Sequence, residues 1–204
     1  MKIHDISILI NENMLLYPGD KSIEIRQVKN VDSNDWNLTN ITLSSHLGTH
    51  VDSPKHVLKD GIGIDQLGIE KFTGNSQVLD LRSIPFGEKI TQKHLKPYLI
   101  QKNDIILFKT RNSSILNEGY NPNHVELSLL GAQYLVDLKI KAVAIDYLSI
   151  GTKDVHEMLL KSNILIYETV NLSDIEAGNY FFMGLPLKIP TEGSPVRAVL
   201  IQNA

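Results

Sequence analysis

The chain has 204 residues, of which 42% are hydrophobic and 21% charged, and its formal net charge is −3 at pH 7. This length supports one domain with its own core, and the near balance of 20 basic and 23 acidic residues lacks the electrostatic footprint of a dedicated nucleic-acid binder. There is no cysteine, which excludes a disulfide framework, a thiolate zinc site and a cysteine nucleophile, so any metal must be held by imidazole and carboxylate groups.

The predicted elements begin with strands. Apolar residues at every second position predict strands over residues 6–10 and 23–28, separated by a turn at Pro18-Gly19-Asp20. Short, largely apolar segments predict buried strands over residues 78–81, 104–108, 142–145 and 164–167. These runs fall far short of the roughly 20 residues that a membrane span needs, and the N-terminus lacks a signal peptide's apolar region. We therefore expect a cytoplasmic protein without a membrane partner.

Two helices alternate with the later strands. Helical apolar spacing predicts one over residues 124–138, with Asn123 as its N-cap, and one over residues 154–161, with Thr152 as a cap. Residues 180–187 and 196–201 return to strand-like patterning. This order predicts a single mixed α/β domain over residues 1–204.

One segment concentrates side chains that bind metals. Residues 44–56 hold three of the seven histidines and one aspartate, at positions His46, His50, Asp52 and His56. All four positions are even, so an extended backbone places them on one face, whereas a helix, at about 100° per residue, does not. Gly48 and Pro54 also disfavour a helix. We expect an extended segment with potential metal ligands on one face.

These residue types suit a catalytic metal better than a structural one. Two histidines and a carboxylate bind Zn²⁺, Mn²⁺ or Fe²⁺ and leave coordination positions open, where the metal lowers the pKa of water towards about 7. His56 is then the natural group to shuttle protons. The alternative is that these histidines are ordinary hydrogen-bonding groups whose spacing is fortuitous.

The segment resembles the His-x-Gly-Thr-His-x-Asp-x-Pro-x-His motif of the metal-dependent cyclase-like hydrolases, a family that includes the bacterial kynurenine formamidases. The resemblance covers nearly the whole chain. It continues in Tyr17-Pro18-Gly19-Asp20, in residues 144–149, in Gly184-Leu185-Pro186-Leu187 and in residues 194–198.

The resemblance implies a swivelling β/β/α-type domain, with a central mixed β-sheet or barrel flanked by helices, and a homodimer or homotetramer. It implies two divalent metals, with Zn²⁺ first and Mn²⁺ as the alternative. By motif, the first metal is held by His46, His50 and Asp52, and Asp52 bridges to a second that His156 and Glu168 complete. His56 takes the role of proton donor and acceptor, and Tyr17 stands where kynurenine formamidases carry a substrate-lining tryptophan.

The implied activity is hydrolysis of a small amide. The substrate is a formamide such as N-formylkynurenine, an intermediate of tryptophan degradation, or a cyclic amide. Tyr17 keeps an aromatic face for such a substrate and adds a hydroxyl group. The alternative is a non-catalytic metal-binding or small-ligand-binding protein on the same fold.

The remaining polar residues carry weaker expectations. Asp146 follows a buried strand, where it either orients a metal-bound histidine or caps the next turn through its own backbone. Arg197 is expected to pair with a carboxylate across the core or a subunit interface. His4, His94 and His124 belong to no comparable cluster and are read as ordinary, and no Gly-x-Ser-x-Gly motif supports a serine hydrolase.

Overall fold

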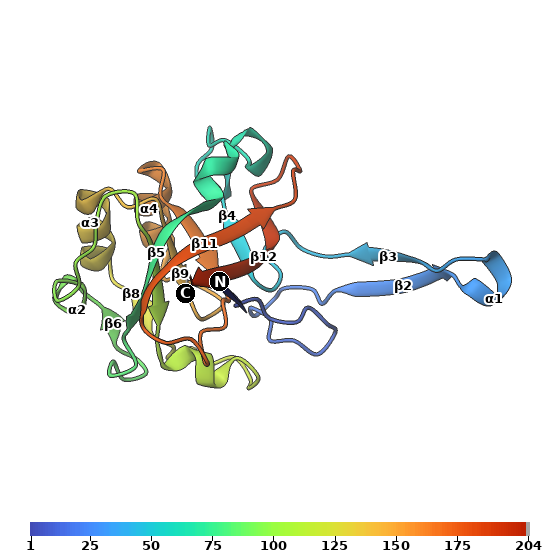
Figure 1. The fold of residues 1–204 in the computed structure, drawn as a ribbon, viewed down its shortest axis with the longest axis horizontal. Helices are drawn as coiled ribbons and strands as arrows, with labels where there is room; N and C mark the ends of the chain where they lie inside the picture. The colour runs from blue at the N-terminus through green and yellow to red at the C-terminus, as the bar shows by residue number, and fades with distance from the viewer. Residues whose placement is uncertain (203–204) are drawn as a thin grey trace.

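The computed structural model describes residues 1–202 and is built around a closed β-barrel, with all but the first of its helices on one side (Figure 1). Over these residues the main sheet has the order β1-β12-β11-β5-β7-β9-β10-β4, and β12 also pairs with β4, which closes a ring of all its strands except β1. The strands of this sheet are β1 (Lys2–Asp5), β4 (His50–Asp52), β5 (Thr73–Asp80), β7 (Ile105–Lys109), β9 (Ala142–Ile145), β10 (Leu165–Glu168), β11 (Gly178–Pro186) and β12 (Gly193–Gln202).

Smaller elements surround the barrel. Strands β6 (Lys89–Ile90) and β8 (Glu126–Leu127) form a short parallel pair, and β2 (Glu24–Lys29) pairs with β3 (Leu38–Thr42) in a hairpin. The helices are α1 (Val31–Asn34), α2 (Gln92–Leu95), α3 (Leu129–Leu138) and α4 (Lys153–Lys161), with 3₁₀ turns at Pro54–His56, Ile64–Gln66, Ile69–Phe72 and Arg111–Ile115. Within residues 1–202, none of the helices has the length and apolar character to span a membrane.

The parallel strands β5, β7, β9 and β10 separate two hydrophobic cores. On β7, Ile105 and Leu107 point into the barrel with side chains from the other barrel strands, while Ile106 and Phe108 pack under the helices. Because successive side chains of a strand point to opposite faces, strands buried on both sides need continuous apolar runs. The closed barrel and the second core under the helices confirm the predicted mixed α/β fold with a central sheet or barrel.

Most predicted strands are confirmed, but two elements were wrongly predicted. Residues 6–10 form no strand: Ile6 is buried in the barrel core, and Ser7 makes only an isolated bridge to Val170, while β1 lies earlier. The helix predicted over residues 124–138 begins at Leu129, because residues 126–127 pair with β6 instead. Its N-cap is Ser128, which accepts a hydrogen bond from the Gly131 N–H, and not Asn123.

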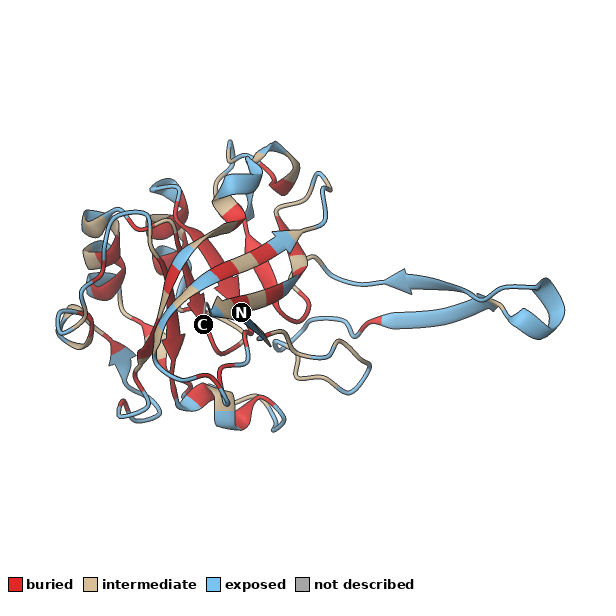
Figure 2. Ribbon diagram, in the orientation of Figure 1, coloured by how far each residue is buried: buried red, intermediate tan, exposed pale blue. Residues whose placement is uncertain are grey.

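The hairpin of β2 and β3, with α1 at its tip, projects far from the barrel (Figure 1). We call residues 24–42 the arm. All of them except Lys29 are exposed (Figure 2), including the apolar side chains of Ile25, Val31, Trp36, Leu38 and Ile41. The arm therefore presents apolar surface that the barrel does not cover, and a two-stranded hairpin without such cover is only marginally stable in water.

Candidate metal centre

Two neighbouring strands and one helix bring the predicted ligands together outside the barrel. Strands β4 and β10 are antiparallel, with His50 opposite Glu168 and Asp52 opposite Ile166. Val51 points into the barrel core, so its neighbours His50 and Asp52 face outwards together with Glu168. His156, from the first turns of α4, lies over the same face.

His46 and His56 reach this face by other means, and the expected extended segment is wrong beyond residues 50–52. His46 lies in a turn where Gly48 adopts a φ of +69°, a left-handed conformation that favours glycine. His56 ends a 3₁₀ turn that starts at Pro54, where proline is well tolerated. The side chains nevertheless converge, and the imidazole centroids of His46 and His56 lie 4.2 Å apart.

Asp52 stands at the centre of the cluster. Its Oδ1 lies 2.9 Å from His46 Nδ1 and 3.5 Å from His50 Nε2, whereas its Oδ2 lies 3.8 Å from His156 Nε2. The two oxygens of Asp52 therefore face different histidines.

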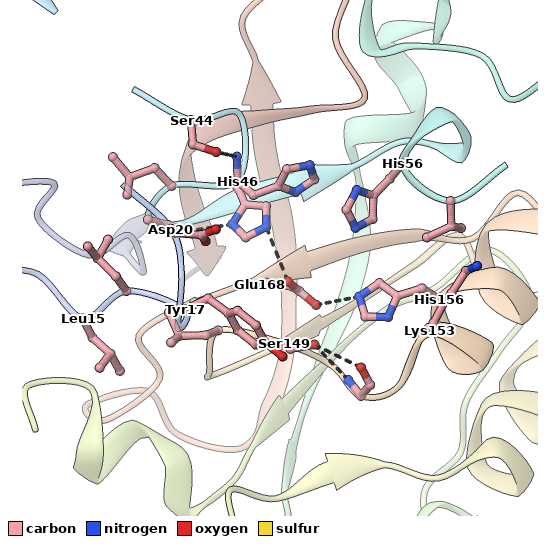
Figure 3. A pocket seen from close by; sticks show the side chains of 17 residues that line it. Leu15, Tyr17, Asp20, Ser44, His46, His56, Ser149, Lys153, His156 and Glu168 are labelled. Carbon is pink, nitrogen blue, oxygen red and sulfur yellow. Dashed lines mark hydrogen bonds and ion pairs between the residues drawn. The ribbon is translucent and has the colours of Figure 1, made fainter. Parts of the chain in front are cut away.

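Glu168 makes a second link within the cluster (Figure 3). Its Oε2 lies 3.4 Å from His50 Nε2, and its Oε1 lies 3.1 Å from His156 Nε2. Together, the two carboxylates join three imidazoles in one continuous group.

This donor set fits a divalent cation. Asp52 is fully buried, yet among residues 1–202 neither of its carboxylate oxygens receives a hydrogen bond of normal geometry, and the same holds for His50 Nε2. Buried polar atoms normally have partners, because burial without one is costly. Ligand atoms lie within 4.8 Å of one another in two sets that share Asp52, one with His46 and His56 and one with His50 and Glu168. Imidazole and carboxylate ligands suit Zn²⁺ or Mn²⁺.

The charges within the cluster shift the pKa values of its members. Burial lowers the pKa of His50 and of His156, but the adjacent carboxylates of Glu168 and Asp52 outweigh it and raise each pKa to about 9. Burial raises the pKa of Glu168, but the imidazoles of His156 and His50 beside it hold it well below its usual range. In the absence of a cation, protons on these histidines balance the carboxylates.

Backbone carbonyls orient two of the histidines. His50 Nδ1 lies 2.8 Å from the Gly48 carbonyl oxygen, and His156 Nδ1 lies 3.0 Å from that of Thr152. A carbonyl can only accept, so Nδ1 is the donor in both rings and Nε2 faces the carboxylates. Such an outer hydrogen bond is typical of metal-binding histidines.

A pocket of about 360 Å³ opens over the cluster (Figure 3). The predicted site residues that line it are Tyr17, His46, His50, His56, His156 and Glu168. Tyr17 lies at its rim, 46% exposed, and meets the ring of Tyr120 edge-on at 5.7 Å. The structure thus brings all the predicted site residues to one pocket, with Asp52 beneath it.

His56 is an exposed residue whose ring is partly desolvated by its neighbours. This desolvation lowers its pKa, the charge of Asp52 raises it, and His46 and His156 lower it, with a net shift below the ordinary value. The imidazole of His56 is therefore neutral near pH 7 and free to accept a proton.

Two other predictions were wrong in detail. Asp146 is fully buried and accepts hydrogen bonds from the backbone N–H and hydroxyl groups of both Thr110 and Ser113. It therefore anchors the 3₁₀ turn after β7. It neither orients a histidine nor caps its own turn. Arg197 does pair with a carboxylate, that of Asp5 on β1, but on the exposed surface of the chain, so the pairing across the core is wrong. The alternative of a pairing at a subunit interface stays a prediction.

Sequence reasoning missed Glu192, which lies beside His46. Its Oε1 accepts a hydrogen bond from Ser45 Oγ at 2.6 Å and lies 3.5 Å from His46 Nε2. No local spacing links positions so far apart in the chain. Its one signal was its place two residues before residues 194–198, which resemble a family motif.

Comparison with known proteins gives a consistent result. Residues 4–152 match the model of a family described as putative cyclase. The chain is 34% identical over 182 residues to cyclase-like protein 1 of Oryza sativa subsp. japonica, covering 82% of this chain and 65% of that protein. It is 30% identical over 207 residues to kynurenine formamidase of Bacillus anthracis, covering 96% and 95%. A solved structure of a predicted metal-dependent hydrolase from Bacillus stearothermophilus superposes with a TM-score of 0.86 at 28% identity, covering 98% and 97%.

Proposed function

This chain belongs to the putative cyclase family, and we propose that it hydrolyses a small formamide, of which N-formylkynurenine is the first to test, or a cyclic amide. As an enzyme it is a metal-dependent hydrolase acting on non-peptide C–N amide bonds. One observation carries the proposal for this chain: the fully buried Asp52 carboxylate receives no normal hydrogen bond among residues 1–202, yet lies between histidines under a pocket.

We assign two sets of metal ligands. The first is His46, His50 and Asp52, and the second is Asp52, His156 and Glu168, with Zn²⁺ the first choice and Mn²⁺ the alternative. The two oxygens of Asp52, one towards His46 and His50 and the other towards His156, support its place in both sets. A bound divalent metal supplies Lewis acidity that polarises the amide carbonyl and lowers the pKa of water towards neutrality.

His56 is the proton carrier in this proposal. Its neutral imidazole, at the pocket wall beside His46, accepts a proton from water as the water oxygen bonds to the carbonyl carbon. When the C–N bond breaks, the same imidazole returns that proton to the departing nitrogen. Tyr17, at the rim, packs against the aromatic part of the substrate.

The test is hydrolysis of N-formylkynurenine by protein refilled with Zn²⁺ or Mn²⁺, followed by absorbance. We expect turnover that a chelator abolishes and metal restores, which would fit a role in tryptophan degradation; we propose that this role is cytoplasmic. No turnover by metal-loaded protein would reject this substrate and direct the assay to cyclic amides and lactones. Failure on all of them would favour a non-catalytic metal-binding protein.

We also propose that the chain assembles as a homodimer, or as a homotetramer built from two dimers, with the arm packed against a second copy. The exposed apolar side chains of the arm, on a hairpin that no part of residues 1–202 covers, support this assembly. Light scattering of the purified protein should give at least twice the mass of one chain. Replacing Trp36 and Ile41 together by aspartate should lower that mass. Replacing Thr39 and Asn40 together by aspartate, at exposed polar positions of the same arm, is the charge-matched control. A monomeric wild-type protein would disprove the assembly.

A further inference from the structure

His46 differs from His50 and His156 in the partner of the ring nitrogen that faces away from Asp52. In His50 and His156 this nitrogen is Nδ1 and contacts a backbone carbonyl oxygen, whereas in His46 it is Nε2, which lies 3.5 Å from the side-chain carboxylate of Glu192. The His46 side chain is also 20% exposed, against 2% for His50. It is the ligand candidate with the least support from the barrel.

Glu192 is fixed from both sides by the segment that carries the ligands. Ser45, directly before His46, donates its hydroxyl to Glu192 Oε1. Ser53, directly after Asp52, donates its backbone N–H and its hydroxyl to the Glu192 carbonyl at 2.9 and 2.8 Å. The carboxylate of Glu192 is therefore held in place independently of the His46 ring.

Gly193 leaves room for that ring. It pairs with Asp52 across the β12–β4 contact, and a Cβ at this position would lie 2.7 Å from His46 Cε1 and 3.0 Å from Nε2. Such distances are too short for a side chain, so the imidazole packs directly on the backbone of residue 193. Glycine is required here for close approach and not for an unusual φ.

From these contacts we infer that Glu192 and Gly193 form a cradle that positions His46 for metal binding. The Glu192 carboxylate, 3.5 Å from Nε2, favours the tautomer with its proton on Nε2, which leaves Nδ1 unprotonated and directed at the metal site beside Asp52 Oδ1. Gly193 fixes the plane of the ring. Glu192 is thus a positioning residue that acts through His46. This inference rests on the proposed metal site.

The test measures metal affinity, with no need for a substrate. Zn²⁺ is titrated into metal-free protein in competition with a chromophoric chelator, for the wild type and for Glu192→Gln, Glu192→Ala and Gly193→Ala. Loss of an outer hydrogen-bond partner typically weakens metal binding 10–100-fold, so we expect a loss of about that size for Glu192→Ala and a smaller one for Glu192→Gln, whose amide oxygen still accepts. Glu88→Ala removes an exposed carboxylate far along the chain and is the matched control.

The loss should fall on one of two metals. Binding to the set with His46 should weaken, while binding to the set with His156 and Glu168 should persist, and the visible spectrum of the Co²⁺-substituted protein should change in the same variants. Affinities within twofold of the wild type for Glu192→Ala and Gly193→Ala would overturn the inference. A wild type that binds no divalent metal would instead disprove the proposed function. If Glu192→Ala is unstable, the isosteric Glu192→Gln decides.

Discussion

The candidate metal centre has two halves that are built differently. His50, Asp52 and Glu168 project from paired strands of the barrel and are buried, whereas His46 and His56 come from a turn and a 3₁₀ segment and are more exposed. The strand-held half has its geometry fixed by sheet register, so it suits tight binding of a cation. The loop-held half lines the pocket from outside, where a proton carrier needs access to substrate.

Asp52→Asn should have the largest effect, because it removes the one charge shared by both proposed ligand sets. We expect loss of both metals and of all metal-dependent turnover, measured by metal content after dialysis and by the formamide assay. Asp146→Asn changes the other fully buried aspartate, whose partners are all donors, so it should lower the melting temperature but keep the metals. Retention of both metals by Asp52→Asn would contradict its bridging role.

His56→Ala separates the halves by function. Because His56 is assigned no metal, the variant should keep its metal content and lose about 10²–10⁴-fold in turnover, the usual contribution of a general acid–base group. The wild-type rate should rise with pH through the lowered pKa of His56, as the neutral form becomes populated. A variant that loses metal instead would place His56 among the ligands, as its proximity to His46 and Asp52 allows.

The buried histidines His50, on β4, and His156, on α4, predict opposite effects of pH on metal-free stability and on metal affinity. Folding raises the pKa of His50 and His156 from 6.5 to about 9, so their contribution to metal-free stability is full below pH 6.5 and is lost as pH rises through 9. Each proposed metal must displace one of these two protons, so the affinity of each site should rise over the same interval, by up to about 10-fold per pH unit.

Thermal unfolding of the metal-free protein and chelator competition at pH 6.5, 7.5 and 8.5 measure both effects. Metal affinity that does not change over this interval would show that His50 and His156 are unprotonated before the metal binds. It would also remove the ion pairs with Glu168 from the account of metal-free stability.

The same division explains what the sequence could predict. The parity argument holds for His50 and Asp52 because they lie on a strand, and it fails for His46 and His56, whose positions depend on Gly48 and Pro54. The buried strand over residues 142–145 was predicted in full, because a strand covered on both faces is apolar at every position.

Partners distant in sequence set the limit of such reasoning. Glu168 was reached only through the family motif, since its place beside His50 depends on the β4–β10 register. Glu192 was missed for the same reason, because its approach to His46 depends on the β12–β4 pairing at Gly193. The helix over residues 124–138 was predicted too long because the pairing of β8 with β6 leaves no local signal.

Tyr17→Trp should have the smallest effect, since it changes only the rim of the pocket. The larger ring gains aromatic contact, worth about 0.5–1.5 kcal/mol for a well-placed pair, so KM for N-formylkynurenine should fall by about 2–13-fold with kcat unchanged. Tyr17→Phe keeps the ring and removes the hydroxyl, so it shows whether that group binds substrate. Equal KM values for all three proteins would mean that the substrate does not touch residue 17. An altered kcat would mean that Tyr17 acts on the reacting bond and belongs with His56 in the loop-held half of the centre.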